Sequence, residues 1–215
     1  MKDRSILAIL ASNALTVGVA LWQGWSLFTL LWPFWLQSVI IGWFSRSRIL
    51  ALQNFSTKGF RVNGRAVEPT EETKRMTANF FALHFGIFHA AYAFFLFTFL
   101  FVDMPAPEGR PPAPPDRIDL LLMGGLAVAF WLTHRDSFRR HVASDARGGR
   151  NIGAVMFLPY ARVLPMHVMI IVGMVMSSGG AVLLFGALKT LADVLMHVVE
   201  HRWMNGGVNL EVSGA

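Results

Sequence analysis

Five ionisable side chains lie at helical spacing in residues 189–203, KTLADVLMHVVEHRW: Lys189, Asp193, His197, Glu200 and His201. On an α-helix, which turns about 100° per residue, these positions form one stripe about 120° wide. Histidines four residues apart on one face can bind the same metal ion, and a neighbouring glutamate can take a proton from a metal-bound water. The segment therefore predicts a hydrolytic metal centre, with further ligands supplied by other elements.

Two histidines elsewhere extend this predicted centre. If the helix that carries His167 begins near residue 162, a rise of about 1.5 Å per residue places His84, His167 and His197 within about 10 Å of one depth in the membrane. We expect four metal ligands and two catalytic carboxylates, in which Asp193 orients a ligand or the water and Glu200 transfers protons: His84, His167, His197, His201, Asp193 and Glu200. Zinc is the favoured metal because it suits neutral imidazoles and lowers the pKa of a bound water to about 7. Iron or haem is the alternative.

The same polar residues also have simpler explanations. An ionisable group near the bilayer centre costs about 2.5 to 3.5 kcal/mol, and a Lys189–Asp193 ion pair would offset part of that cost without any ligand. His89 lies about 140° from His84 around its helix and is expected to form a hydrogen bond between helices. His134 and His141 lie in an arginine-rich segment, where we expect them to be solvated.

The composition indicates a membrane protein. Of the 215 residues, 54% are hydrophobic and 15% are charged, which is too apolar for an ordinary soluble domain of this length. The chain has no cysteine, so thiolate ligands and cysteine nucleophiles are excluded. The net charge of +6 is carried by segments between apolar runs that offer no aromatic platform for bases, so nucleic acid is not expected as a partner.

Six apolar runs predict an all-α, polytopic membrane bundle. The predicted spans are residues 6–22, 27–44, 77–102, 118–133, 162–176 and 181–203, in one membrane domain of residues 1–205 followed by a short tail of residues 206–215. Most runs approach the roughly 20 residues that cross a bilayer as a helix, and none alternates as a barrel strand does.

The connecting segments predict how the bundle is oriented. Residues 45–76 and 134–151 are rich in lysine and arginine, whereas the proline-rich residues 103–117 and the neutral residues 177–180 are not. Because basic loops remain in the cytoplasm, both termini are expected there, in a bacterial inner membrane.

Two families resemble this sequence. The stretches LLWPFWLQSVIIGWFSRSRIL, ALHFGIFHAAYAFF and KTLADVLMHVVEHR are similar to an uncharacterised family of small bacterial inner-membrane proteins, known only as a domain of unknown function. More loosely, His84, His197 and His201 resemble the zinc ligands of the alkaline ceramidase and progestin-receptor superfamily, although that superfamily has seven spans. The five residues HVVEH, residues 197–201, also resemble the inverzincin metalloprotease signature.

Three functions follow as expectations. The first is an intramembrane zinc-dependent hydrolase that acts on a lipid or a membrane-proximal peptide. The second is a non-enzymatic membrane protein that binds haem or a metal. The third is a structural or assembly factor, in which the polar stripe only holds helices together.

Overall fold

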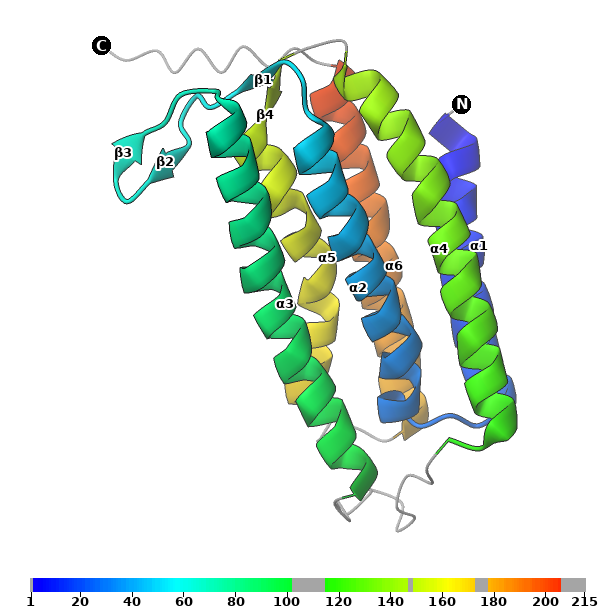
Figure 1. Cartoon of the computed structure of the whole chain (residues 1–215). Helices are drawn as coiled ribbons and strands as arrows, with labels where there is room; N and C mark the ends of the chain where they lie inside the picture. Colours follow the sequence, from blue (N-terminus) through cyan, green and yellow to red (C-terminus); the bar gives the residue numbers. More distant parts are fainter. Residues whose placement is uncertain (1, 102–114, 147–148, 173–177, 206–215) are drawn as a thin grey trace.

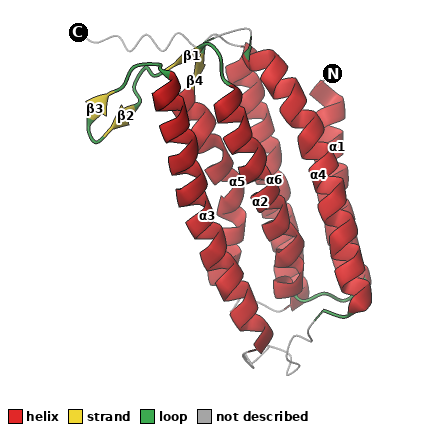
Figure 2. Cartoon of the chain, in the orientation of Figure 1, coloured by secondary structure: helices red, strands yellow, loops and turns green. Residues whose placement is uncertain are grey.

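The computed structural model describes residues 2–101, 115–146, 149–172 and 178–205, so the predicted tail of residues 206–215 lies outside the described residues. For some residues near helix ends, only the backbone is described. Within these ranges the chain forms six helices that run side by side (Figure 1), namely α1 (Lys2–Trp22), α2 (Leu27–Ala51), α3 (Glu71–Phe101), α4 (Arg117–Asp145), α5 (Ile152–Val172) and α6 (Ser178–Asn205). Figure 2 shows that helices make up nearly all of the described fold, as the sequence predicts.

Among the described residues, three helices are long and apolar enough to cross a membrane: α2, α4 and the residues of α3 from Glu71 to Thr98. Large apolar side chains cover the outside of the bundle. Leu83 and Phe94 on α3 are 67% and 70% exposed, and Leu121 on α4 is 76% exposed. Such surfaces suit contact with lipid and would be unfavourable in water, so the structure indicates a membrane protein.

Two helices have limits that differ from the predicted spans. α4 continues to Asp145, well beyond the predicted end at residue 133, and α5 begins at Ile152 rather than near residue 162. The arginine-rich part of α4 is polar on its exposed side, and it therefore looks like a loop in a hydropathy pattern although it continues the helix. In α5, Pro159 and Pro165 lie inside the helix, where the sequence suggests a helix start.

Helix α2 lies at the centre of the bundle and packs against α3, α4 and α5. Its Phe34 is 1% exposed and contacts the rings of Phe130 on α4 and Phe185 on α6, with centroids 6.3 and 5.0 Å apart. Aromatic pairs at such separations add to the favourable burial of the rings. Phe34 thus joins α4 and α6 to α2, within a core to which α1, α3 and α5 also contribute buried residues.

One end of the bundle, here called the basic end, is fastened by an ion-pair cluster. The carboxylate of Asp145 at the end of α4 is 2.7 Å from Nε of Arg48 on α2 and 3.1 Å from Nε of Arg150. Arg48 also donates from Nη2 to the other carboxylate oxygen, at 3.2 Å, so its contact is bidentate. The buried Asp145 thus connects α2, α4 and the strand that precedes α5.

Short strands lie at the same end of the bundle (Figure 1). β1 (Phe55–Ser56) pairs in parallel with β4 (Arg150–Asn151). β2 (Arg61–Val62) and β3 (Arg65–Ala66) form a hairpin whose two turn residues, Asn63 and Gly64, have φ angles of 51° and 77°. Positive φ at both positions fits a type I′ turn, for which the sequence Asn-Gly is favoured.

Gly42 permits the close contact between α2 and α3, which yields a first prediction. A methyl group at Gly42 would lie 2.6 Å from Cε1 of Phe85, whereas one at Gly86 would meet nothing within 4 Å. We expect Gly42→Ala to lower the free energy of unfolding by about 1 to 3 kcal/mol through overpacking. Gly86→Ala should cause no loss, since alanine favours helix by up to about 1 kcal/mol over glycine. Thermal unfolding in detergent measures both, and equal stabilities would contradict the packing described here.

Candidate functional site

The buried ion pair expected at the start of the polar stripe is present. Nζ of Lys189 lies 2.7 Å from each carboxylate oxygen of Asp193, and the two residues are 1% and 6% exposed. Nδ2 of Asn13 on α1 donates to the same carboxylate at 3.0 Å. The ammonium group also lies 5.7 Å from the centroid of the Phe34 ring. Asp193 therefore accepts three hydrogen bonds, of which the one from Asn13 connects α1 to α6.

His84 and His167 form hydrogen bonds with tyrosines, at two different levels of the bundle. Nδ1 of His84 is 2.9 Å from the hydroxyl of Tyr160, and Nδ1 of His167 is 2.9 Å from the hydroxyl of Tyr92. Tyr92 is eight residues beyond His84 on α3, a rise of about 12 Å. His84 and His167 are thus separated by about the 10 Å that the sequence allows for histidines of one centre, and each contacts its own tyrosine.

The remaining members of the predicted metal centre are His197, Glu200 and His201. All three belong to α6, but their side chains lie outside the described residues. Among the side chains that the structure does describe, no group of three or more histidine, aspartate or glutamate residues could hold a metal ion. The zinc centre therefore stays a prediction.

A pocket of about 200 Å³ opens between α3 and α5, and is called the α3–α5 pocket below. Its lining is mostly aromatic and aliphatic, with two histidines and two tyrosines: Phe85, Phe88, His89, Tyr92, Tyr160, Val163, Leu164 and His167. The hydrogen bonds of His84 to Tyr160 and of Tyr92 to His167 hold the two helices together along it. A mainly apolar pocket with a few polar groups is the usual form of a site for a small organic ligand.

His89 gives this pocket its chemistry. The residue is 4% exposed, and its ring stacks on that of Phe85 with centroids 4.1 Å apart. Its Nδ1 lies 2.8 Å from the carbonyl oxygen of Phe85. A carbonyl oxygen only accepts hydrogen bonds, so Nδ1 carries the hydrogen. In the neutral ring Nε2 then has a lone pair, and this atom is buried with no hydrogen-bond partner among the described residues.

A buried lone pair without a partner, on a residue that lines a pocket, calls for an explanation, because buried polar atoms are nearly always hydrogen-bonded. A ligand that donates a hydrogen bond would supply the missing partner of His89. A metal ion would also be chemically suited, since a histidine that binds a metal commonly donates its other N–H to a backbone carbonyl. The arrangement thus favours a ligand with a hydroxyl or amide donor.

The tyrosines of this pocket and the role of His89 were not predicted from the sequence. The chain has 18 phenylalanines but only two tyrosines, and both of them, Tyr92 and Tyr160, line the pocket and contact histidines. The rarity of tyrosine could have indicated these two residues, since a phenol hydroxyl inside an apolar helix needs a hydrogen-bond partner. His89 was expected to bond between helices, whereas its Nδ1 bonds within α3 to Phe85.

A second, smaller cavity lies at the basic end and corrects the prediction for His134 and His141. Both residues belong to α4, and both line a cavity of about 60 Å³ between α2, α4 and α5. Each is partly buried. The expectation that they are solvated loop residues is therefore wrong, because α4 extends through this segment and turns them towards the bundle.

Comparison with known proteins identifies one relation. A family model described as a family of unknown function, DUF6498, matches residues 1–207. No curated protein and no solved structure matches the chain.

The buried ion pair provides a test of the interior described here. Asp193→Ala should lower the free energy of unfolding by about 3 to 5 kcal/mol, because it leaves the charge of Lys189 buried without its partner. The double variant Lys189→Met with Asp193→Asn should retain most of the stability, since no charge is left and an asparagine can still accept from Asn13. Thermal unfolding in detergent compares the three proteins. A double variant less stable than Asp193→Ala would contradict the pairing.

Proposed function

We propose that this chain, which belongs to the DUF6498 family of unknown function, is a multi-pass protein of the bacterial inner membrane. It binds a small hydroxylated ring molecule in the α3–α5 pocket. A hydroquinone or phenol head group is the ligand class that fits best. The observation that carries the proposal is the buried, unpaired Nε2 of His89.

Each property of this pocket supports such a ligand. The walls of Phe85, Phe88, Val163 and Leu164 suit an apolar ring, and a volume of about 200 Å³ suits one or two rings. Nε2 of His89 is an acceptor, so it favours a hydroxyl over a carbonyl on that ring. The site would therefore distinguish a hydroquinone from the corresponding quinone.

The location in the membrane is part of the proposal. The apolar outer surface and the three long apolar helices support insertion, and we extend this to six spans with both termini in the cytoplasm. In Figure 1, α1 begins and α6 ends at the basic end of the bundle, and the connections from α2 to α3 and from α4 to α5 lie there too. The excess of arginine at this end supports a cytoplasmic position.

Single cysteines would test the orientation, because the natural chain has none. Arg65 in β3 and Arg117 at the start of α4 are both exposed, at opposite ends of the bundle. In bacterial spheroplasts, a membrane-impermeant maleimide should label Arg117→Cys directly and Arg65→Cys only after the membrane is permeabilised. The cysteine-free protein is the control, and the reverse labelling pattern would refute the orientation.

Ligand binding is tested with three matched molecules: tetramethylhydroquinone, its quinone and tetramethylbenzene. Calorimetry on detergent-purified protein, without oxygen, should show the hydroquinone binding about tenfold more tightly than the other two, which is the effect of one hydrogen bond. His89→Phe keeps a stacked ring but removes the acceptor, so it should abolish this preference. Leu83→Phe is the control, because Leu83 is exposed on α3 and does not line the pocket, and the preference should persist.

Two results would contradict the proposed ligand. Equal affinity of the three molecules for the natural protein would refute the proposal. A Soret absorption band in the purified protein that is lost in His89→Phe would assign a haem to the pocket instead.

The zinc-dependent hydrolase predicted from residues 189–203 is a second candidate, supported by the spacing of His197, Glu200 and His201 on α6. Elemental analysis of the same preparation tests it. Zinc at one ion per chain, lost in His197→Ala, would support it, and the absence of zinc from the purified protein would refute it.

A further inference from the structure

We infer that the ligand of the α3–α5 pocket is itself a membrane lipid, in which the hydroxylated ring carries a hydrocarbon tail. The ring enters from the bilayer through an opening between α3 and α5, and the tail remains outside in the lipid. This rests on the proposed function, since the ring occupies the same pocket.

The pocket is closed on its inner side and open on its outer side. The inner lining residues are between 4% and 8% exposed, namely Phe85, His89, Tyr92 and Val163. Phe88 on α3 and Leu164 on α5 line the same pocket but are 45% and 60% exposed. Helix α3 lies at one edge of the bundle, where it packs against α2 and α5 (Figure 1). The pocket therefore opens to the outside of the bundle, between Phe88 and Leu164, and this gap is called the lateral opening below.

Two hydrogen bonds between α3 and α5 bound the lateral opening at its ends: that of His84 with Tyr160, and that of Tyr92 with His167. They lie about 12 Å apart along α3. Phe88 is one helical turn from both of its bonded neighbours on α3, and Leu164 lies between the bonded residues of α5. Because each pair joins a ring nitrogen to a hydroxyl, the sides of the opening between the pairs are apolar.

The lateral opening lies at the depth of the hydrocarbon core. His89 is at the middle of the predicted span of residues 77–102, far from both membrane surfaces. The exposed side chains beside the opening, Ile87 on α3 and Phe157 on α5, are also apolar. A molecule dissolved in water would have to cross lipid to reach this opening, whereas a molecule dissolved in the bilayer meets it directly.

The volume of the pocket places the tail outside it. About 200 Å³ is filled by one or two rings, which leaves no room for a long chain. A tail that passes between Phe88 and Leu164 stays among apolar side chains and lipid, so it never meets water. The structure thus favours a ring with a long hydrocarbon chain over a small phenol from the cytoplasm.

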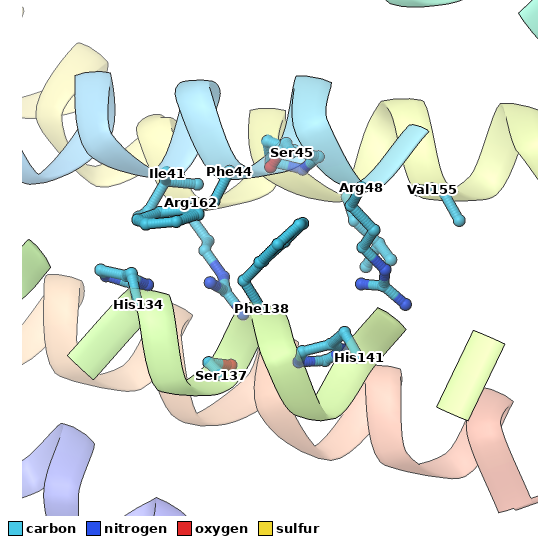
Figure 3. Close-up of a pocket in the computed structure, with 12 residues that line it drawn as sticks. Ile41, Phe44, Ser45, Arg48, His134, Ser137, Phe138, His141, Val155 and Arg162 are labelled. Carbon is cyan, nitrogen blue, oxygen red and sulfur yellow. The ribbon is translucent and has the colours of Figure 1, made fainter. Parts of the chain in front are cut away.

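The cavity at the basic end is unsuited to such a molecule. Figure 3 shows Arg48 and Arg162 there, with Ser137 on the facing helix, and the cavity holds only about 60 Å³. Hydrocarbon placed against these groups would remove water from them without replacing its hydrogen bonds. A tailed ring is therefore expected in the α3–α5 pocket.

Calorimetry on the full chain in nanodiscs of phosphatidylcholine tests the tail. The probes are tetramethylhydroquinone and its analogue in which a decyl chain replaces one methyl group, both without oxygen, and decylbenzene is the blank. Affinities are compared at equal concentration of probe in the bilayer, after partition into protein-free nanodiscs is measured. The two hydroquinones should bind the natural protein within about threefold of one another, because the tail stays in lipid.

A bulky residue at the lateral opening should separate the two probes. Leu164→Trp should weaken binding of the decyl compound about tenfold more than binding of tetramethylhydroquinone, because the indole fills the exit of the tail. Leu121→Trp on α4 is the matched control, since Leu121 is exposed and does not line the pocket. It should change neither affinity.

The two probes distinguish failure of the tail from failure of the pocket. Binding of tetramethylhydroquinone to the natural protein with at least about tenfold weaker binding of the decyl compound would overturn the inference and keep the proposed function. Binding of neither hydroquinone would refute both. Equal weakening of the two probes in Leu164→Trp would also overturn the inference. The comparison in the natural protein needs no variant, so it decides the question even if Leu164→Trp does not fold.

Discussion

The interior of a membrane offers no water to a polar group, so each polar side chain among these helices must find its partner within the bundle. Most of them do. Lys189 and Asp193 pair within α6, Asn13 on α1 donates to the same carboxylate, and the two tyrosines each contact a histidine across α3 and α5. Against this background an unpaired atom is informative. Nε2 of His89 is buried without a partner among the described residues, as are the side-chain oxygens of Asn13 and Gln37, but of these three residues only His89 lines the α3–α5 pocket, which is why the proposed ligand is placed there.

The same rule explains how much of the architecture follows from the sequence. The six helices could be predicted, because each needs a long apolar run and hydropathy detects such runs directly. Their ends could not be predicted as well. The arginine-rich part of α4 is stabilised by contacts with other segments, such as Asp145 with Arg48, and the prolines of α5 are tolerated inside the helix although they usually lie near its start.

The candidate site was less accessible to sequence reasoning, for a related reason. The Lys189–Asp193 pair is local, since its members are one helical turn apart, and it was expected. The pairs His84 with Tyr160 and Tyr92 with His167 depend on how α3 and α5 are aligned along the bundle. That alignment could not be predicted, because α5 begins ten residues before its predicted start. Spacing within one helix can be read from the sequence, whereas the relative height of two helices requires coordinates.

The two prolines of α5 have a mechanical consequence. Neither has an N–H group, so the carbonyls of Val155 and Ala161, four residues earlier, accept no helical hydrogen bond from them, and the helix is weakened at these points. Pro159 lines the basic cavity, while Tyr160 and Val163, only one and four residues further on, line the α3–α5 pocket. The two cavities thus share one deformable wall. If filling one of them bends α5, the affinity of the other must change by a factor that is the same in both directions.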